Sequence, residues 1–471
     1  MPSSTSGFPS HIRDLPSPAS HFLLGHLPRF QKGPKHLVLE NWAQECGDLY
    51  RIRLGLQDFL VSTDPDFNGE VLKRRPADFR RHPKISEILE EIGVSSVFNA
   101  EGEYWARHRK PVAEALNLKK VKSFYPSLAH KTAQLLQVCQ QHVERIEPLP
   151  VRSIIQRFTL DLTTSVVFGY PLNTLGGEQS ELHRALQLVF PMVNQRMSAP
   201  LPTWRWWKSR ADREFENALS YIRVVVQDFI EQARREIREE KDDQRQGSNF
   251  LKALLQDQQS HGLSDAEIFS AVFTLLLAGE DTSANSLAWA FFYLAQHPEV
   301  VSELRTEAKH VYGESPLPRS VEEHRQLKLA EAVAMETIRL KPTSPQLILQ
   351  TLHPLVIQGL NLPAGTNVIV QNRVAQSRAA YFSKPDEFLP QRWITGQCPM
   401  GFDHQPEMVR AFGGGPRFCP GKHLALHEMV IVISVICRHF ELELVEHPET
   451  IGEAYSFTMH PEEFGVRLSA V

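Results

Sequence analysis

The segment from Ser264 to Gln296 constrains the fold of this chain more than any other, because it predicts one very long helix. Ser264-Asp265-Ala266-Glu267 has the pattern of a capping box, in which serine and glutamate side chains satisfy free backbone amides at a helix start. Helix formers and apolar residues then continue until His297-Pro298 ends the pattern. With a rise of about 1.5 Å per residue, the helix would be roughly 45 to 50 Å long.

This helix is apolar on most of its sides around Phe273 to Leu277, as expected for a helix that runs through the centre of a protein. A membrane span is the alternative interpretation, but polar residues follow directly and interrupt the apolar run. These residues are Glu280, Asp281, Thr282, Ser283, Asn285 and Ser286. A central helix of a soluble protein is therefore the favoured interpretation.

The composition is that of a globular protein. The chain has 471 residues, of which 42% are hydrophobic, so it can bury a large core. Lys plus Arg is 51 and Asp plus Glu is 55, which leaves a formal charge of −4 and no global electrostatic basis for binding nucleic acid. Because no repeat and no long linker divides the chain, we expect a single domain over residues 1–471.

The cysteines and the N-terminus indicate the compartment. The five cysteines are odd in number, scattered, and form no C-x-x-C pair, so they indicate neither a disulfide framework nor a zinc ribbon. The first ten residues, M-P-S-S-T-S-G-F-P-S, lack the basic and apolar regions of a signal peptide, and F-L-L-G-H-L is too short to span a bilayer. We therefore expect a cytoplasmic protein without a transmembrane anchor.

Strand patterns are short. Asp48 to Leu54 and Phe59 to Ser62 predict a hairpin, and Leu355 to Gln358 and Asn367 to Gln371 predict a second small sheet around the turn residues P-A-G-T. The predicted fold class is therefore mainly α with small β-sheets.

The segment from Phe412 to Ala425, F-G-G-G-P-R-F-C-P-G-K-H-L-A, is where the chain concentrates unusual chemistry. Glycines allow backbone conformations that other residues avoid, and the two prolines stiffen their neighbours, which predicts a constrained loop. The residues beyond Cys419 have a helical pattern, so we expect this cysteine at a helix N-terminus, where free amides favour a thiolate. A thiolate in this position can bind a metal or attack a substrate.

Three interpretations of Cys419 follow from the residues alone. A buried, inert cysteine needs neither three glycines nor Arg417 two residues upstream. A zinc site could use Cys419, His423 and His427, which are spaced along one helix face, but no fourth ligand lies nearby in the sequence. Ligation of haem by the thiolate would use the arginine to pair with a propionate and the glycines to let the backbone approach the porphyrin.

F-G-G-G-P-R-F-C-P-G resembles the cysteine-ligand loop of the cytochrome P450 family, F-x-x-G-x-R-x-C-x-G, at every specified position. The resemblance implies Cys419 as the metal ligand of haem b, iron protoporphyrin IX. It also implies that Phe412 packs against the sulfur, that Arg417 binds a propionate and that Gly413 lies beside the porphyrin. The haem would lie between the long central helix and this loop.

Other segments carry the same resemblance. Glu336-Thr337-Ile338-Arg339 matches the E-x-x-R motif of the family, and P-D-E-F-L-P-Q-R-W resembles a later segment whose arginine, here Arg392, completes a triad with Glu336 and Arg339. Gln391 stands where the family usually has glutamate, and this departure does not touch the triad. A buried network of this kind is stable only when all its members are hydrogen-bonded, so it can fix the loop that carries the cysteine.

Ala278-Gly279-Glu280-Asp281-Thr282-Ser283 resembles the oxygen-activating segment of the family's long helix. The resemblance implies that Gly279 leaves room for dioxygen, that Thr282 donates a hydrogen bond there, and that Asp281, beside Glu280, supplies protons. Further upstream, W-A-R-H-R resembles the family's W-x-x-x-R. Trp105 and Arg109 would then hold propionates.

The activity implied by the resemblance is that of a monooxygenase, which inserts one oxygen atom of dioxygen into a substrate. The chain ends at Val471, so we expect no fused reductase and instead a ferredoxin or flavodoxin with its own reductase. Docking would use a basic surface, and a merely solvated charged face is the alternative. The basic residues are Arg107, Arg109, Lys110, Lys119, Lys120 and Lys422.

Candidate substrate contacts are mostly apolar and favour a hydrophobic substrate. They lie in Ile85 to Phe98, in Phe190 to Trp207, in Thr343 to Ile348, and at Phe273, Leu277, Leu347 and Phe457. The stretch T-W-R-W-W-K, Thr203 to Lys208, could touch a membrane surface or an acidic ligand, although packed tryptophans are the preferred interpretation. Two other functions remain open, a peroxide-driven peroxygenase and a non-catalytic haem-thiolate sensor or carrier.

Overall fold

The computed structural model describes residues 10–170, 172–177, 180–239, 249–256, 258, 262–394 and 404–471. The chain forms two compact units. The first takes the described residues of Met1–Glu87, Ser344–Glu387 and Phe402–Cys419, and the second takes those of Ile88–Thr343, Phe388–Gly401 and Pro420–Val471. The single haem domain expected over residues 1–471 stays a prediction.

The first unit is built on a five-stranded sheet of order β1-β2-β8-β5-β3, in which β2 and β8 are parallel and the other neighbours are antiparallel. Its elements are η1 (Ile12–Asp14), α1 (Leu27–Phe30), α2 (Lys35–Cys46), β1 (Leu49–Leu54), β2 (Gln57–Ser62), α3 (Pro65–Arg74), β3 (Phe79–Arg81), β5 (Gln346–Thr351), β6 (Leu355–Ile357), β7 (Leu360–Leu362), β8 (Asn367–Gln371), α18 (Arg373–Gln376), η6 (Pro406–Met408) and η7 (Gly415–Arg417). Helix α4 (Pro83–Glu91) leads the chain into the second unit.

Alternation along the strands gives this sheet two apolar faces. In β2, Leu60 joins a core cluster with Phe67 of α3, whereas Val61 joins the opposite cluster with Trp42 of α2. Successive side chains of a strand point to opposite faces, so helices cover both sides of the sheet.

The predicted hairpin of Asp48 to Leu54 and Phe59 to Ser62 is confirmed as β1 and β2. The predicted pairing of Leu355 to Gln358 with Asn367 to Gln371 is wrong, because β6 pairs with β7 and β8 lies between β2 and β5. All five residues of β8 are buried. A strand buried on both faces belongs inside a larger sheet, and its length alone does not reveal its partners.

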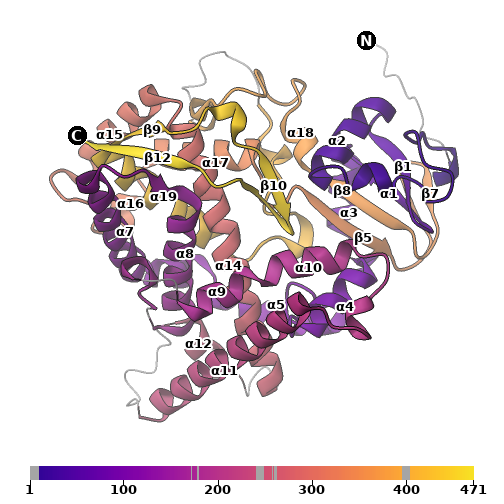
Figure 1. The fold of residues 1–471 in the computed structure, drawn as a ribbon, viewed down its shortest axis with the longest axis horizontal. Helices are drawn as coiled ribbons and strands as arrows, with labels where there is room; N and C mark the ends of the chain where they lie inside the picture. Colours follow the sequence, from indigo (N-terminus) through magenta and orange to yellow (C-terminus); the bar gives the residue numbers. More distant parts are fainter. Residues whose placement is uncertain are drawn as a thin grey trace. The chain divides into compact units, whose positions relative to one another are not determined.

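The second unit is mainly helical, which confirms the predicted fold class (Figure 1). Its helices are α5 (Gly102–Ala115), α6 (Leu118–Ser123), α7 (Tyr125–Arg145), α8 (Val151–Phe168), η2 (Thr174–Gly176), α9 (Glu181–Gln187), α10 (Val189–Ser198), η3 (Thr203–Arg205), α11 (Arg210–Glu239), α12 (Phe250–Gln256), α14 (Asp265–Leu294), α15 (Pro298–Tyr312), α16 (Val321–His324), α17 (Lys328–Leu340), η5 (Pro390–Trp393), α19 (Lys422–His439) and η8 (Pro448–Thr450). Its strands are β4 (Leu149–Pro150), β9 (Phe440–Leu444), β10 (Glu453–Ser456), β11 (Thr458–Pro461) and β12 (Gly465–Ala470).

Helix α14 is the predicted long helix. Its capping box is present: the Ser264 hydroxyl accepts from the Glu267 backbone N–H, and Glu267 Oε2 accepts from the Ser264 N–H at 2.7 Å. The helix packs against α8, α17 and α19 within the second unit (Figure 1). Among the described residues, the structure holds no helix with the length and apolar character that crossing a bilayer requires.

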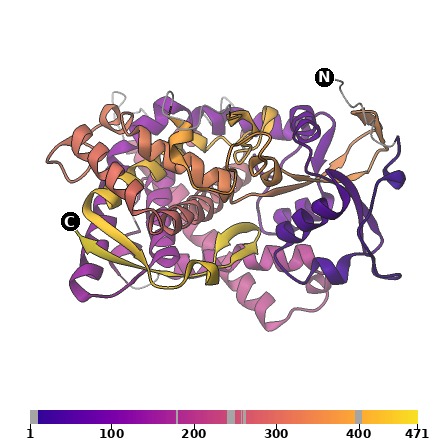
Figure 2. The same ribbon diagram turned by 90° about the horizontal axis from the view of Figure 1, so that it is seen from above.

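The strands after α19 belong to two small sheets. Strand β12 pairs with β9 and β4, and β9 and β12 can be followed side by side in Figure 2. Strands β10 and β11 form a separate hairpin in which Ser456 faces Thr458, so Phe457 alone makes the turn. This hairpin packs on α14 and α10.

Candidate functional site

The cysteine loop of the first unit requires glycine at two positions. Gly413 and Gly415 have φ angles of +74° and +62°, which L side chains rarely adopt. At Gly415 a Cβ atom would also lie 2.3 Å from the backbone oxygen of Leu72 in α3. The loop closes where the Cys419 N–H donates to the Phe412 carbonyl at 2.8 Å, so backbone geometry fixes the position of the cysteine.

The helix after Cys419 begins later than predicted. Helix α19 starts at Lys422 with Gly421 at its N-cap, so Cys419 lies in the loop ahead of the helix. Cys139 and Cys437, in contrast, are fully buried thiols, and burial raises the pKa of Cys139 to about 12 and that of Cys437 even further. These two cysteines are inert packing residues.

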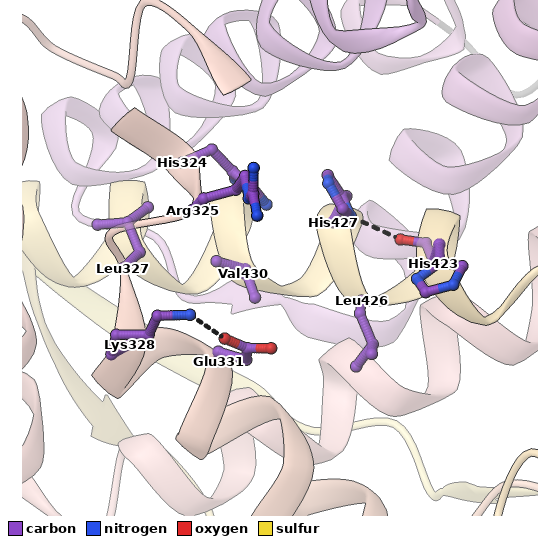
Figure 3. Close-up of a pocket in the computed structure, with 9 residues that line it drawn as sticks. All are labelled: His324, Arg325, Leu327, Lys328, Glu331, His423, Leu426, His427 and Val430. Atoms are coloured by element: carbon purple, nitrogen blue, oxygen red, sulfur yellow. Dashed lines mark hydrogen bonds and ion pairs between the residues drawn. The ribbon is translucent and has the colours of Figure 1, made fainter. Parts of the chain in front are cut away.

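The zinc interpretation finds no support. The described part of the chain contains no group of three or more His, Cys, Asp or Glu residues that could hold a metal ion. His427 instead donates from Nδ1 to the His423 carbonyl at 2.7 Å, and its ring stacks on that of His324 with centroids 4.6 Å apart. The two rings lie in a pocket of about 220 Å³ between α16, α17 and α19, with Arg325 and Lys328 at its margin (Figure 3).

Glu336, Arg339 and Arg392 form one buried network in the second unit. Arg339 donates to both oxygens of Glu336, at 2.8 and 2.9 Å, and Arg392 Nε donates to Oε1 at 2.9 Å. Glu336 and Arg339 are 0% exposed and Arg392 is 2% exposed. Removing a carboxylate and two guanidinium groups from water is costly, and this cost is offset only when the hydrogen bonds are complete.

Two donors that the sequence did not reveal complete this network. Trp393 Nε1 donates to Glu336 Oε2 at 2.9 Å, and the Leu389 N–H donates to Oε1 at 3.0 Å. The tryptophan stands directly after Arg392 in P-Q-R-W, so its aromatic N–H was the available signal. Glu336 therefore ties α17 to the segment around η5.

Between residues 270 and 291, helix α14 is buried except for one strip. Ala278 is exposed and Leu275, Gly279 and Thr282 are partly exposed, at the spacing of one helix face. The Thr282 hydroxyl donates to the Ala278 carbonyl at 2.8 Å. Ala278, Gly279 and Thr282 give this part of the strip only small side chains, which leaves room for a broad, flat ligand, so the residues present fit the haem that the resemblance implies.

Gly279 has a second reason to lack a side chain. A Cβ atom there would lie 3.0 Å from Oγ1 and 3.1 Å from Cγ2 of Thr163 in α8. The glycine therefore lets α8 and α14 approach closely, a contact that the sequence could not reveal.

The two acids beside Thr282 have different surroundings. Glu280 is fully buried, and burial, together with the neighbouring charge of Asp281, raises its pKa well above the ordinary value. Its Oε1 atom has no hydrogen-bond partner among the described residues. Asp281 is also buried, but its Oδ2 accepts a hydrogen bond from the Thr458 hydroxyl of β11. The structure thus places next to Thr282 one acid with a raised pKa and one acid that accepts a hydrogen bond.

Trp105 and Arg109 both lie on α5, with Trp105 buried and Arg109 partly buried. Arg107, predicted as part of a docking surface, forms an ion pair with Glu267 at the start of α14. This pairing partly neutralises its charge.

Three aromatic side chains from the predicted substrate segments meet in the second unit. The rings of Phe190 and Phe457 stack with centroids 5.2 Å apart, and the ring of Phe98 meets Phe457 edge-on at 6.1 Å. We call Phe98, Phe190 and Phe457 the aromatic cluster. Segments far apart in the sequence thus contribute to one cluster of apolar side chains.

The other substrate candidates are dispersed. Phe273 and Leu277 are buried on α14, and the Thr343 carbonyl accepts from the Met459 N–H beside the β10–β11 hairpin at 2.8 Å. Ile85 is buried in the first unit, where Leu347 packs on the apolar cluster of the sheet.

The tryptophans of the stretch Thr203 to Lys208 differ in burial. Trp204 is buried and its Nε1 donates to Glu91 at 2.9 Å, as the packing interpretation predicts. Trp206 and Trp207 are 74% and 80% exposed, so the same interpretation is wrong for them.

Comparison with known proteins identifies the family. The model of the Cytochrome P450 family matches residues 15–468. A relative from Arabidopsis thaliana, Protein LUTEIN DEFICIENT 5, chloroplastic, is 26% identical over 90% of this chain and 72% of its own length. Carotene epsilon-monooxygenase, chloroplastic, also from Arabidopsis thaliana, is 25% identical over 91% of this chain and 80% of its own length. Cytochrome P450 4V2 of Pongo abelii is 25% identical over 84% of this chain and 78% of its own length.

The family match spans nearly the whole chain and includes the cysteine loop, the buried Glu336 network and the accessible strip of α14. A haem-iron cofactor and an oxidoreductase chemistry are properties of this family. The chain is therefore a member of the cytochrome P450 family.

Proposed function

We propose that this protein is a haem-thiolate monooxygenase that oxidises a hydrophobic organic substrate with electrons from a separate donor. In the net reaction one atom of dioxygen enters a C–H bond of the substrate. The other atom leaves as water, with two electrons from the donor and two protons from solvent. The observation that carries the proposal is the position of Thr282, partly exposed on α14, next to the buried Asp281.

The chain's own residues would have separate tasks. Cys419 would hold the iron of haem b, and Arg417, Trp105 and Arg109 would hold its propionates. When bound, the haem supplies the redox chemistry that activates dioxygen. Asp281 would supply protons, and the Thr282 hydroxyl would pass them on.

The substrate would contact the aromatic cluster. Stacked rings give an apolar surface that excludes water and favours large apolar ligands over polar ones. One relative is named a carotene monooxygenase, so terpenoids belong in a ligand panel next to fatty acids, steroids and aromatic compounds.

A peroxygenase and a haem-thiolate sensor are the other candidates. A peroxide user receives dioxygen already reduced by two electrons and carrying two protons, so it has no need of an acid and an alcohol that deliver protons. The pair of Asp281 and Thr282 therefore favours dioxygen as the co-substrate. Cytoplasmic location stays a prediction.

The electron donor would bind to cationic residues of the second unit. Helices α6 and α16 both pack against α19, and the charge of Lys122 on α6 acts on His427 of α19. The pocket of Figure 3 adds Arg325 to this surface, whereas Lys328 beside it is paired with Glu331 at 3.0 Å. An acidic ferredoxin or flavodoxin has the complementary charge, and its attraction should weaken with salt.

Replacing Thr282 tests the proposed activity. We expect Thr282→Ala to consume electrons at a similar rate but to yield several-fold less product per electron pair, with Thr282→Ser close to the unmodified protein. Unchanged coupling in Thr282→Ala would contradict proton delivery through this hydroxyl. Turnover with peroxide but not with dioxygen and a reduced donor would establish the peroxygenase, and ligand binding without either turnover would establish the sensor.

Charge reversal tests the electron donor. We expect Lys110→Glu and Lys422→Glu to slow reduction by an acidic ferredoxin and to flatten the dependence of that rate on ionic strength. Arg210→Glu, at an exposed position of α11 outside this basic surface, is the matched control. Equal rates and equal salt dependence in all three variants would contradict the docking surface.

A further inference from the structure

We propose that Thr458 is a positioning residue that holds Asp281 in one orientation and links that orientation to ligand contact at Phe457. The proposal rests on the proposed function for the role of Asp281 in proton delivery. Its physical basis is a hydrogen-bonded chain beneath the β10–β11 hairpin. All the residues of this hydrogen-bonded chain lie in the second unit.

The chain of hydrogen bonds has four members. The Thr458 hydroxyl donates to Asp281 Oδ2 and accepts from Asn285 Nδ2 at 3.3 Å. Arg152 Nε of α8 then donates to Asn285 Oδ1 at 3.4 Å. Asp281, Asn285 and Thr458 are each no more than 6% exposed, whereas Arg152 is partly exposed. These hydrogen bonds therefore connect Arg152, at the surface of α8, to the buried carboxylate of Asp281.

All the donors point the same way. Each N–H or O–H group in the chain is directed toward Asp281, which can only accept when it is ionised. Glu280, Arg152, His460 and Glu462 are charged or titratable groups around this site. A donor chain that ends on a carboxylate is stronger than a neutral one, so it holds the side chain in place.

The hairpin joins this chain to the aromatic cluster through adjacent residues. Phe457, whose ring stacks on Phe190, precedes Thr458 directly and has a φ angle of +80°. A phenylalanine in this region of φ is strained and persists only where its surroundings hold it. Met459 is held on the other side by its bond to the Thr343 carbonyl.

A ligand that displaces the Phe457 ring would therefore act on the strained residue next to Thr458. If the backbone at Phe457 relaxes, the Thr458 hydroxyl moves relative to Asp281 and the carboxylate is released to exchange protons. By linkage, the bond between Thr458 and Asp281 must in turn change the affinity for such a ligand. Proton delivery would then depend on whether a substrate is present.

The bond itself can be tested without turnover. We would measure guanidinium unfolding of the holoprotein for Thr458→Val, Thr458→Ser, Asp281→Ala and the double variant Thr458→Val with Asp281→Ala. We expect Thr458→Val to raise the equilibrium constant for unfolding about tenfold, and less than about threefold when Asp281 is already alanine, which offers no acceptor. Thr458→Ser keeps the hydroxyl and should behave like the unmodified protein. Equal effects of Thr458→Val in both backgrounds would overturn the proposal.

The link to the aromatic cluster can be tested with two spectroscopic probes of the haem, 4-phenylimidazole and imidazole. We expect Thr458→Val to change the dissociation constant of 4-phenylimidazole at least about threefold and to leave that of imidazole unchanged. General damage to the fold would shift both probes, and no shift in either would mean no coupling. Both of these results would overturn the link.

A third measurement separates this inference from the proposed function. We expect the solvent hydrogen isotope effect on product formation to change in Thr458→Val and to be restored in Thr458→Ser. Absence of any dioxygen-dependent turnover in the unmodified protein would defeat the proposed function, and the unfolding cycle would still decide whether Thr458 holds Asp281. An isotope effect that is identical in all variants, with turnover present, would overturn the role of Thr458 in proton delivery.

Discussion

Arg392 Nε lies 2.9 Å from Glu336 Oε1, and this contact joins two segments of the second unit that are distant in the sequence. Three further groups donate to the same carboxylate, from Arg339, Trp393 and Leu389. The two guanidinium groups depend most on the negative charge of Glu336, because both are removed from water.

We expect Glu336→Gln to lower the free energy of unfolding by about 3–5 kcal/mol, because it leaves two guanidinium groups without a counter-charge. Denaturant unfolding of the purified protein would measure this loss. Arg210→Gln removes one member of an exposed ion pair, Arg210 with Glu214, and should change stability little. A loss no larger than that of this control would show that the network is not required for stability.

The buried acid Glu428 predicts how stability depends on pH. Complete burial raises its pKa to about 8, whereas an unfolded glutamate titrates near 4.5. The folded state therefore binds more protons than the unfolded state between these values, so the stabilising effect is complete below about pH 4.5 and is lost as pH rises through 8. The slope from one such group is at most about 1.4 kcal/mol per pH unit.

We expect Glu428→Gln to remove the contribution of Glu428 to the pH dependence of stability. The free energy of unfolding should then fall less steeply between pH 6 and about pH 8. Unfolding titrations at several pH values in this window would compare the two proteins. Glu280, whose pKa is also raised, should retain its own share of the slope in this variant. Parallel curves for the variant and the unmodified protein would contradict a neutral Glu428.

The cysteine loop offers a matched pair of glycines. We expect Gly415→Ala to lower the free energy of unfolding by more than about 2 kcal/mol, because it combines a φ of +62° with a clash against the Leu72 carbonyl. Gly414, with a φ of −165°, has its nearest neighbour at an ordinary 3.5 Å, so Gly414→Ala should be tolerated. Haem content and denaturant unfolding would measure both variants, and equal behaviour would contradict the backbone argument.

The aromatic cluster predicts a selective change in ligand affinity. We expect Phe190→Leu to weaken binding of aromatic ligands about threefold to tenfold, because it removes a stacked ring from the contact with Phe457. Phe292→Leu is the control, since Phe292 packs against Trp289 and Phe464 outside the cluster. Spectral titrations would measure both, and equal losses in the two variants would argue against a ligand contact at Phe190.

Features that depend on local interactions could be predicted from the residues alone. The capping box at Ser264 and Glu267 fixed the start of α14, and the spacing of Glu336 and Arg339 brought them together on one helix face. The glycines and the cysteine of the loop identified the family for the same reason, because backbone geometry and a single thiolate depend on few neighbours.

Contacts between residues far apart in the chain could not be predicted in this way, because they follow from the packing of whole elements. The placement of β8 between β2 and β5, the bond between Thr458 and Asp281, the approach of Gly279 to Thr163 and the pairing of Arg107 with Glu267 are all of this kind. Such contacts form only where the packing of whole elements brings two side chains together, and hydrophobic burial specifies that packing without direction. Local patterns therefore predicted which residues carry the chemistry, and the fold decided which partners hold them.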